Sequence, residues 1–232
     1  MFSRRTFVTS AAAVSVAATS ASAQDACSVF TATRQKSTSP EAAVQLLKDG
    51  NARFVAGKMT NCDLMAQVRA TASGQSPIAV VIGCIDSRVP PEMVFDQKIG
   101  DIFAARVAGN FVNDDIIGSV EFATKVAGAK VIVVLGHTEC GAIKGAVDGA
   151  KLGRLTKMLE NFKPAVEASK GVEGEKTSKN KKLVQAVADT NAKLAAKKLT
   201  DRSDVLRDMV AKKELVIVSA MHDISTGTVK FL

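Results

Sequence analysis

Two short segments of the sequence carry side chains that bind transition metals. Cys84 begins one of them, and His137 and Cys140, three positions apart, form the other. Thiolate sulfur and imidazole nitrogen are ligands that Zn²⁺ prefers, and three protein ligands leave a fourth position open for water or substrate. The residue types and their spacing therefore predict a catalytic site that holds one Zn²⁺ per chain on Cys84, His137 and Cys140.

A carboxylate and a guanidinium follow Cys84 at alternate positions, as Asp86 and Arg88. Alternate side chains of an extended segment point to the same side, so both can face the metal. Asp86 can then accept a hydrogen bond from a metal-bound hydroxide, while Arg88 holds the carboxylate in place. Taken without Cys84, the two residues would be an ordinary ion pair that braces a turn. The adjacent metal ligand favours the catalytic interpretation.

Each metal ligand also has a structural interpretation when it is considered alone. A single cysteine is usually a small buried thiol, and a single histidine can be a core residue with satisfied nitrogens. The coincidence of two thiols, an imidazole, a carboxylate and a guanidinium favours a metal site. His222, next to Asp223, has no such neighbours in the sequence, so we expect a structural role for it.

Each ligand segment follows a continuous apolar run that is rich in Val and Ile. Residues 78–83 precede Cys84, and residues 131–136 precede His137. Such runs are typical of strands that are covered on both faces in a parallel sheet. Functional groups gather at the carboxyl ends of such strands, so we expect the two ligand segments to converge there.

The rest of the sequence alternates between strand and helix patterns. Residues 102–107 and 215–220 predict two further strands, and the helical patterns are at 114–127, 181–198 and 201–212. Ser39 and Pro40 are favourable residues for the start of an N-terminal amphipathic helix. We therefore expect an α/β fold with a central, mostly parallel β-sheet flanked by helices, and an N-terminal helical arm. A stretch rich in Gly, Ser, Glu and Lys, residues 169–182, predicts a flexible loop.

The composition fits a single domain over residues 24–232. Of the 232 residues, 47% are hydrophobic, which is enough for one ordinary core. The formal net charge of +8 could indicate a nucleic-acid partner, but aromatic residues make up only 4% and no recognition motif is present. We expect no nucleic-acid partner.

Residues 1–23 have the pattern of an export signal peptide. Arg4 and Arg5 are followed by small apolar residues that end in a small-residue segment at 21–23. The paired arginines resemble the twin-arginine signature of proteins that are exported already folded. The apolar stretch is short for a helix that spans a bilayer, so we expect cleavage near Ala23, a periplasmic or secreted mature protein and no stable membrane anchor.

Cys27 and Cys62 lie in polar N-terminal sequence, away from the ligand segments. In an oxidising compartment a disulfide between them is chemically permitted. The residues themselves leave a disulfide and two free thiols equally open.

Several segments resemble the beta class of carbonic anhydrases. They are GCIDSRVPPEMVFDQKIGDIFAARVAGN at 83–110, VVLGHTECGAIKGA at 133–146, LLKDGNARFVAG at 46–57 and HDISTGTVKFL at 222–232. The resemblance covers nearly all of the chain after the signal, apart from the loop. It implies a zinc enzyme that hydrates carbon dioxide reversibly to bicarbonate and a proton, by attack of a zinc-bound hydroxide.

The same resemblance implies Cys84, His137 and Cys140 as the zinc ligands, with Asp86 and Arg88 as the catalytic pair. In this family the carboxylate equivalent to Asp86 swings onto the zinc in the closed resting form of some members. The residues of the chain do not decide between the open and the closed form.

The resemblance also implies a substrate pocket at a dimer interface, lined by Gln75, Phe103 and Gly141, and hence a homodimer or a higher homo-oligomer. Two positions depart from the family pattern. Phe122 stands where some members carry Tyr, and Val107 stands where the family often has Asn. The motifs of the metal site and the catalytic pair are intact.

Two alternative functions use the same residues. A hydrolase of carbonyl sulfide or carbon disulfide would keep the zinc site and differ in the shape of its entrance, so its motifs would look nearly identical. A structural or zinc-storage protein would need a fourth permanent protein ligand, which Asp86 could supply. Turnover of the two kinds of substrate separates the two enzymes, and permanent ligation by Asp86 would favour the structural protein.

Overall fold

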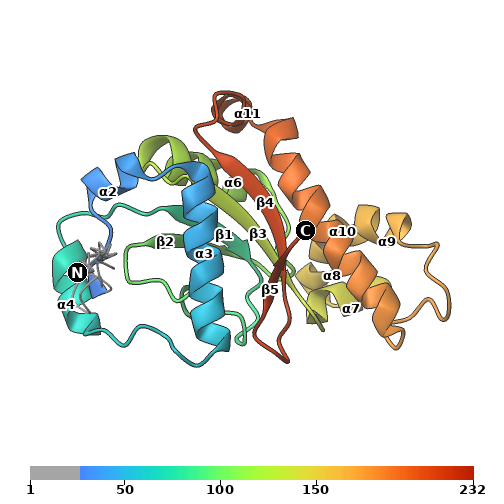
Figure 1. Ribbon diagram of the computed structural model, residues 1–232. Coiled ribbons are helices and arrows are strands. Elements are labelled where there is room, and N and C mark those ends of the chain that lie inside the picture. Colours follow the sequence, from blue (N-terminus) through green and yellow to red (C-terminus); the bar gives the residue numbers. More distant parts are fainter. Residues whose placement is uncertain (1–26) are drawn as a thin grey trace, which may run out of the picture.

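The sheet at the centre of the molecule has five strands in the order β2-β1-β3-β4-β5 (Figure 1). This computed structural model describes residues 27–232, so the export signal expected at 1–23 lies outside the described residues. The first four strands run parallel and β5 pairs antiparallel with β4, which confirms the mostly parallel sheet. The strands are β1 (Ala79–Gly83), β2 (Ile102–Arg106), β3 (Val131–His137), β4 (Val216–His222) and β5 (Val229–Phe231).

Helices cover both faces of the sheet (Figure 1). On one face Leu47 of α3 packs with Val81 and Val133. On the opposite face Leu199 of α10 packs with Val134. The helices are α2 (Ala32–Ser37), α3 (Pro40–Val55), α4 (Leu64–Thr71), α5 (Pro91–Val94), α6 (Asp114–Glu121), the π-helix η1 (Phe122–Val126), α7 (Gly141–Val147), α8 (Gly153–Leu159), the 3₁₀-helix η2 (Glu160–Phe162), α9 (Lys163–Ala168), α10 (Lys181–Arg202) and α11 (Asp204–Ala211). In the described part of the chain no helix combines the length and the hydropathy needed to cross a membrane.

The two central strands, β1 and β3, are buried along their whole length. Their continuous Val and Ile runs predict this, because a strand covered by helices on both faces has no solvent-facing side. The edge strand β2 is different, since its residues alternate between partly buried and exposed beyond Ile102. The sequence patterns do not predict β5, a strand of only three residues whose backbone pairing with β4 defines it.

Two helix boundaries differ from those predicted. The helix expected over 114–127 changes to a π-helix at Phe122. The helices expected over 181–198 and 201–212 meet instead at Ser203, whose side chain accepts a hydrogen bond from a backbone N–H of α11. A serine cap of this kind stabilises the start of a helix, so the chain can turn at this residue without a longer loop.

The segment expected to be a flexible loop consists of turns up to Asn180, and Lys181 and Lys182 already belong to α10. The Asn180 side chain caps α10 and also donates hydrogen bonds to the carbonyl oxygens of Glu173 and Glu175. The turns are therefore tied to the start of the helix. The flexibility of this segment stays a prediction.

The N-terminal arm is held on the domain by buried hydrogen bonds. The N–H of Phe30 donates to Asp101, at a distance of 2.9 Å to Oδ1. The Gln35 amide donates to the carbonyl oxygens of Pro77 and Ala127, at 2.6 and 2.8 Å. Cys27 and Cys62 are joined by a disulfide, which decides between the two options that the sequence leaves open.

Removal of this disulfide should lower the free energy of unfolding. The bridge joins cysteines that are 35 residues apart, and without this cross-link the unfolded chain gains conformational entropy that lowers the stability by about 4 kcal/mol. Urea unfolding of the zinc-loaded Cys27→Ser/Cys62→Ser variant should show the loss. A thiol reductant should destabilise the wild type but leave the variant unchanged, and equal stability of the two oxidised proteins would contradict the prediction.

Candidate metal centre

The carboxyl ends of β1 and β3 bring the three expected ligands together. Gly83, the last residue of β1, pairs with Leu135 of β3, so Cys84 follows β1 beside the strand end that carries His137. The chain then turns back, and Cys140 precedes the first residue of α7. One ligand atom from each of the three side chains lies within 4.8 Å of the other two, and all three residues are buried. The convergence predicted from the strand patterns is confirmed.

The imidazole of His137 is oriented to bind a metal through Nε2. Its Nδ1 lies 2.9 Å from the carbonyl oxygen of Thr138, which can only accept, so Nδ1 carries the proton. The lone pair of Nε2 is therefore free, and this buried atom has no hydrogen-bond partner among the described residues. An unpaired buried nitrogen is unfavourable. The site fits zinc, which would bind Nε2 together with the two thiolates.

The two cysteines of the site are held in different protonation states. A hydrogen bond from the Cys140 thiol, followed by hydrogen bonds from the backbone N–H groups of Gly109 and Asp86, lowers the pKa of Cys84 to about 4. The same pairing, together with burial, raises the pKa of Cys140. Zinc binds cysteine as thiolate, so zinc binding must displace the Cys140 proton.

An ion pair stands beside the ligands. Arg88 Nε lies 2.9 Å from Asp86 Oδ1, and Arg88 Nη2 lies 2.7 Å from Oδ2. This bidentate contact with Arg88 holds the pKa of Asp86 well below its usual range, so the carboxyl is ionised at neutral pH. Asp86 Oδ2 also lies 3.9 Å from His137 Nε2. The carboxylate thus faces the nitrogen that is left free for a metal.

Two residues that the sequence patterns do not assign hold the Cys84 segment in place. Arg106, at the end of β2, donates to the carbonyl oxygens of Cys84 and Asp86 at 2.8 and 2.6 Å. The N–H of Gly109 donates to the Cys84 sulfur at 3.2 Å. Both residues lie in the segment RVAGN, residues 106–110. This segment is part of the sequence that resembles the family, but the resemblance does not predict these two contacts.

His222 is the cross-strand neighbour of His137 in the register of β3 and β4. It is buried, and neither of its ring nitrogens has a hydrogen-bond partner among the described residues. Burial lowers its pKa, which favours the neutral ring. It does not belong to the three-ligand group, and its expected structural role stays a prediction.

The expected pocket residues lie in separate places of the single chain. Gly141 follows Cys140 at the start of α7. Gln75 is exposed and precedes β1, at the amino end of the strand whose carboxyl end leads to the metal site. Phe103 lies on β2 with its ring centroid 6.2 Å from that of Phe122, and both line a hollow of about 740 Å³. One chain alone does not bring Gln75 and Phe103 to the metal ligands.

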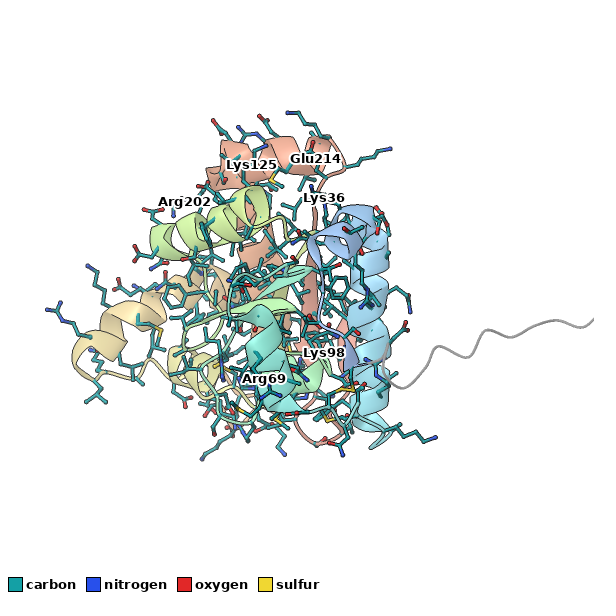
Figure 2. The ribbon with its side chains drawn as sticks, turned by 90° about the vertical axis from the view of Figure 1, so that its left-hand side faces the viewer. Lys36, Arg69, Lys98, Lys125, Arg202 and Glu214 are labelled. Atoms are coloured by element: carbon teal, nitrogen blue, oxygen red, sulfur yellow. A yellow bond between two sulfur atoms is a disulfide. The ribbon has the colours of Figure 1, made fainter. Side chains whose placement is uncertain are left out.

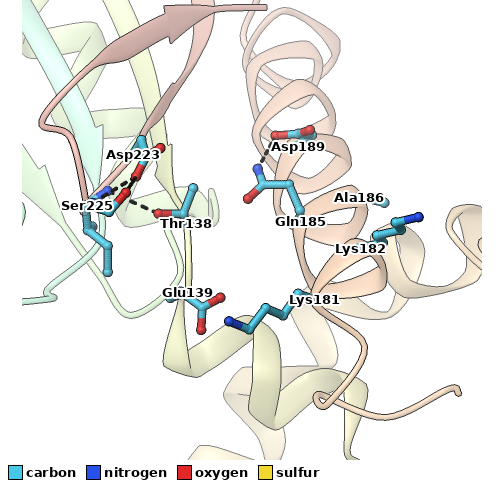
Figure 3. Close-up of a pocket in the computed structure, with 10 residues that line it drawn as sticks. Thr138, Glu139, Lys181, Lys182, Gln185, Ala186, Asp189, Asp223 and Ser225 are labelled. Carbon is cyan, nitrogen blue, oxygen red and sulfur yellow. Dashed lines mark hydrogen bonds between the residues drawn. The ribbon is translucent and has the colours of Figure 1, made fainter.

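A groove of about 840 Å³ with several charged residues in its lining borders the loop between the ligands (Figure 3). Glu139 of this loop and Lys181 of α10 point toward each other across it. Asp189 of α10 and Asp223 after β4 line its other end. Acidic and basic groups thus share the groove, and none of the three metal ligands is among its lining residues. Its position gives it no direct part in the metal site.

Comparison with known sequences relates these features to a family. Residues 79–229 match the family model described as carbonic anhydrase. The chain is 36% identical over 197 residues to "Carbonic anhydrase 2" of Mycobacterium tuberculosis, and the aligned region covers 82% of this chain and 91% of that protein. It is 45% identical over 117 residues to a carbonic anhydrase of Mycolicibacterium smegmatis, which covers 50% of this chain and 57% of that protein.

Solved structures give the same relationship. A tetrameric beta-carbonic anhydrase of the ascomycete Sordaria macrospora has a TM-score of 0.61 and 29% identity, over 69% of this chain and 83% of that one. A beta-carbonic anhydrase of Aspergillus fumigatus has a TM-score of 0.65 and 26% identity, over 83% and 89%. The matched family region contains Cys84, His137 and Cys140. The chain therefore belongs to the beta class of the carbonic anhydrases, zinc enzymes that hydrate carbon dioxide.

Proposed function

We propose that this chain hydrates carbon dioxide with Asp86 and Arg88 as its catalytic pair. The observation that carries the proposal is the position of the Asp86 carboxylate. Arg88 binds both of its oxygens, and Oδ2 lies 3.9 Å from the free Nε2 of His137. When bound, zinc would supply a Lewis acid that lowers the pKa of a water molecule to about 7. The side chains of the protein must then orient that water, so that a lone pair of its oxygen and not a hydrogen points toward the substrate.

Asp86 has the right charge and position for this task. Because its carboxyl is ionised, Oδ2 can only accept, so it takes a hydrogen bond from the reacting water and turns a water lone pair toward the substrate. Arg88 occupies both carboxylate oxygens from one side, which restricts the rotation of the group. Two thiolates and one neutral imidazole cancel the 2+ charge of zinc. Orientation by Asp86 therefore matters more than it would beside an all-histidine site.

The contact between Asp86 and Arg88 also supports an open form of the enzyme. A carboxylate held by two hydrogen bonds to a guanidinium would have to break both to become a metal ligand. A structural zinc protein would need that fourth ligand permanently. The ion pair therefore favours a catalytic site over a structural one.

We further propose that the enzyme works as a homo-oligomer that completes its pocket across an interface. The outer edge of β2 has no strand beside it in the described chain. Figure 2 looks onto this side of the molecule, with Arg69 and Lys98 toward one end and Lys36 and Lys125 toward the other. The apolar ring of Phe122 is 54% exposed there, against the hollow that Phe103 lines.

A second copy seated on this edge would cover the exposed ring and supply the missing pocket residues. Gln75 and Phe103 lie away from the metal ligands of their own chain, as expected if they line the pocket of a partner. The tetrameric relative from Sordaria macrospora supports an assembly of this kind. The proposal accounts for the contiguous apolar lining of this hollow, to which Phe103, Ile116 and Phe122 contribute.

We place the mature protein in the periplasm or outside the cell. The support is the signal pattern of residues 1–23 together with the Cys27–Cys62 disulfide, because disulfides persist in oxidising compartments. Mass spectrometry of cell fractions should find a chain that begins near residue 24 outside the cytoplasm. A full-length chain confined to the cytoplasm would contradict the placement.

Substitution of Asp86 should separate catalysis from metal binding. Asp86→Asn keeps the shape but removes the charge, so stopped-flow carbon dioxide hydration should fall about 100-fold while the zinc content stays near that of the wild type. Cys140→Ser removes a metal ligand and should lose zinc and activity together. Asp189→Asn on α10, outside the site, serves as the matched control and should change neither. Equal losses of zinc and activity in Asp86→Asn would refute its catalytic role.

The choice of substrate is tested with the same proteins. At equal zinc content, the wild type should turn over carbon dioxide faster than carbonyl sulfide, and Asp86→Asn should impair both reactions. Faster turnover of carbonyl sulfide would assign the chain to the sulfur-substrate hydrolases instead. Zinc without either activity would favour a structural metal site.

A charge on the proposed interface should separate the subunits. Phe122→Asp places a carboxylate where an apolar ring is covered, which should weaken association by about 2 kcal/mol and lower hydration while zinc stays bound. Sedimentation velocity over a range of concentrations measures the change. Leu152→Asp, at a residue that is 70% exposed and lies between α7 and α8, is the matched control. If the Phe122→Asp variant kept the oligomeric state of the wild type, this surface would not be part of the subunit interface.

A further inference from the structure

Helix α10 carries a buried asparagine that reaches the metal site through the backbone of another loop. Asn191 is 5% exposed, and its Nδ2 donates to the carbonyl oxygen of Gly109 at 2.9 Å. The N–H of the same Gly109 donates to the Cys84 sulfur at 3.2 Å. The carbonyl oxygen of Gly109 thus accepts a hydrogen bond from α10, and its N–H donates one to the metal ligand Cys84.

The position of Gly109 depends on very close packing. Its φ is +78°, which favours glycine, and a Cβ there would lie 2.4 Å from Cζ of Phe162 and 3.1 Å from Cβ of Ala142. Gly109 has no side chain to fix its peptide groups, which are held by hydrogen bonds of the main chain, including one from the Asn110 N–H to the Val107 carbonyl oxygen at 3.1 Å. Glycine is also the residue with the greatest backbone freedom. The Asn191 amide adds an anchor from outside this turn, on the Gly109 carbonyl oxygen.

We propose that Asn191 is a positioning residue of the metal centre: by holding the Gly109 carbonyl, it keeps the Gly109 N–H on the Cys84 sulfur and thereby slows the loss of zinc. An amide hydrogen bond to a thiolate stabilises its negative charge, and does so more strongly in a buried site than in water. Partners of metal ligands typically change metal affinity by 10- to 100-fold when they are removed.

The Cys84 sulfur accepts hydrogen bonds from two backbone N–H groups, those of Gly109 and Asp86. Arg106 binds the backbone carbonyl of Cys84, so it fixes the main chain and not the sulfur atom. The Cys140 thiol also donates to that sulfur, but it becomes a zinc ligand itself when the metal binds. In the zinc-loaded protein the Gly109 N–H is then one of two backbone donors to the Cys84 thiolate, and it is the one whose residue α10 holds through Asn191.

The rate of zinc release tests the proposal without reference to catalysis. Asn191→Asp replaces the donating amide with a carboxylate that repels the Gly109 carbonyl, so transfer of zinc to a chromophoric chelator should become about 10-fold faster than in the wild type. The thiolate-to-metal charge-transfer band of the cobalt-substituted variant should also shift. A general loss of stability would not move that band.

Asn51 supplies a matched control. It is also an asparagine that is 5% exposed on a helix, and its Nδ2 donates to the carbonyl oxygens of Val94 and Gly227 at 3.0 and 2.9 Å. Asn51→Asp should leave the cobalt band and the rate of zinc release near those of the wild type. Equal acceleration in both variants would show general loosening and overturn the proposal, as would a wild-type rate in Asn191→Asp.

A second pair of variants covers a failure of Asn191→Asp to fold. Asn191→Ser and Asn51→Ser introduce no charge, and the shorter serine at 191 cannot reach the Gly109 carbonyl. Faster zinc release and a shifted cobalt band in Asn191→Ser alone would support the proposal, and identical behaviour of the two serine variants would overturn it. Because neither readout is carbon dioxide hydration, the result is independent of the catalytic roles of Asp86 and Arg88.

Discussion

The parallel pairing of β1 with β3 is the constraint on which the metal site depends. Parallel strands end at the same edge of a sheet, so the register that aligns Gly83 with Leu135 also sets Cys84 beside His137. Two strands that are buried on both faces allow little freedom in this register, because a slip would unpair backbone groups that no water can reach. The strand core therefore positions the ligands before any metal is bound.

The loop between His137 and Cys140 is short and has to reverse direction at once. Glu139 adopts a left-handed backbone conformation with φ of 58°, which costs roughly 1–2 kcal/mol in a residue other than glycine. The Thr138 N–H donates to the carbonyl of His222, and the Lys144 ammonium pairs with the Glu139 carboxylate. These contacts hold a strained turn, and the turn is what points the Cys140 thiol back at the end of β1.

Much of this arrangement could be predicted from the residues. Continuous apolar runs identify β1 and β3, and ligand types just beyond them identify the metal site, since both signals are local in sequence. The Ser39 cap is another local signal, and its side chain accepts the expected hydrogen bond from the Ala42 N–H.

The remaining features depend on contacts between distant segments. The hydrogen bond from Asn191 to Gly109 joins residues 82 positions apart, and no sequence pattern in either segment predicts it. The short strand β5 exists only through its pairing with β4. Gln75 and Phe103 carry no signal of a pocket in their own chain, because the surface they are proposed to complete belongs to a second copy.

The central claim is that Cys84, His137 and Cys140 hold a zinc ion whose fourth position is free for water. Zinc K-edge X-ray absorption of the purified protein at neutral pH tests it most directly. The account predicts two sulfur atoms at about 2.3 Å and two light atoms at about 2.0 Å, one of them exchangeable with a small anion. A site with more than two sulfur atoms, or with a fourth ligand that no small anion displaces, would contradict it.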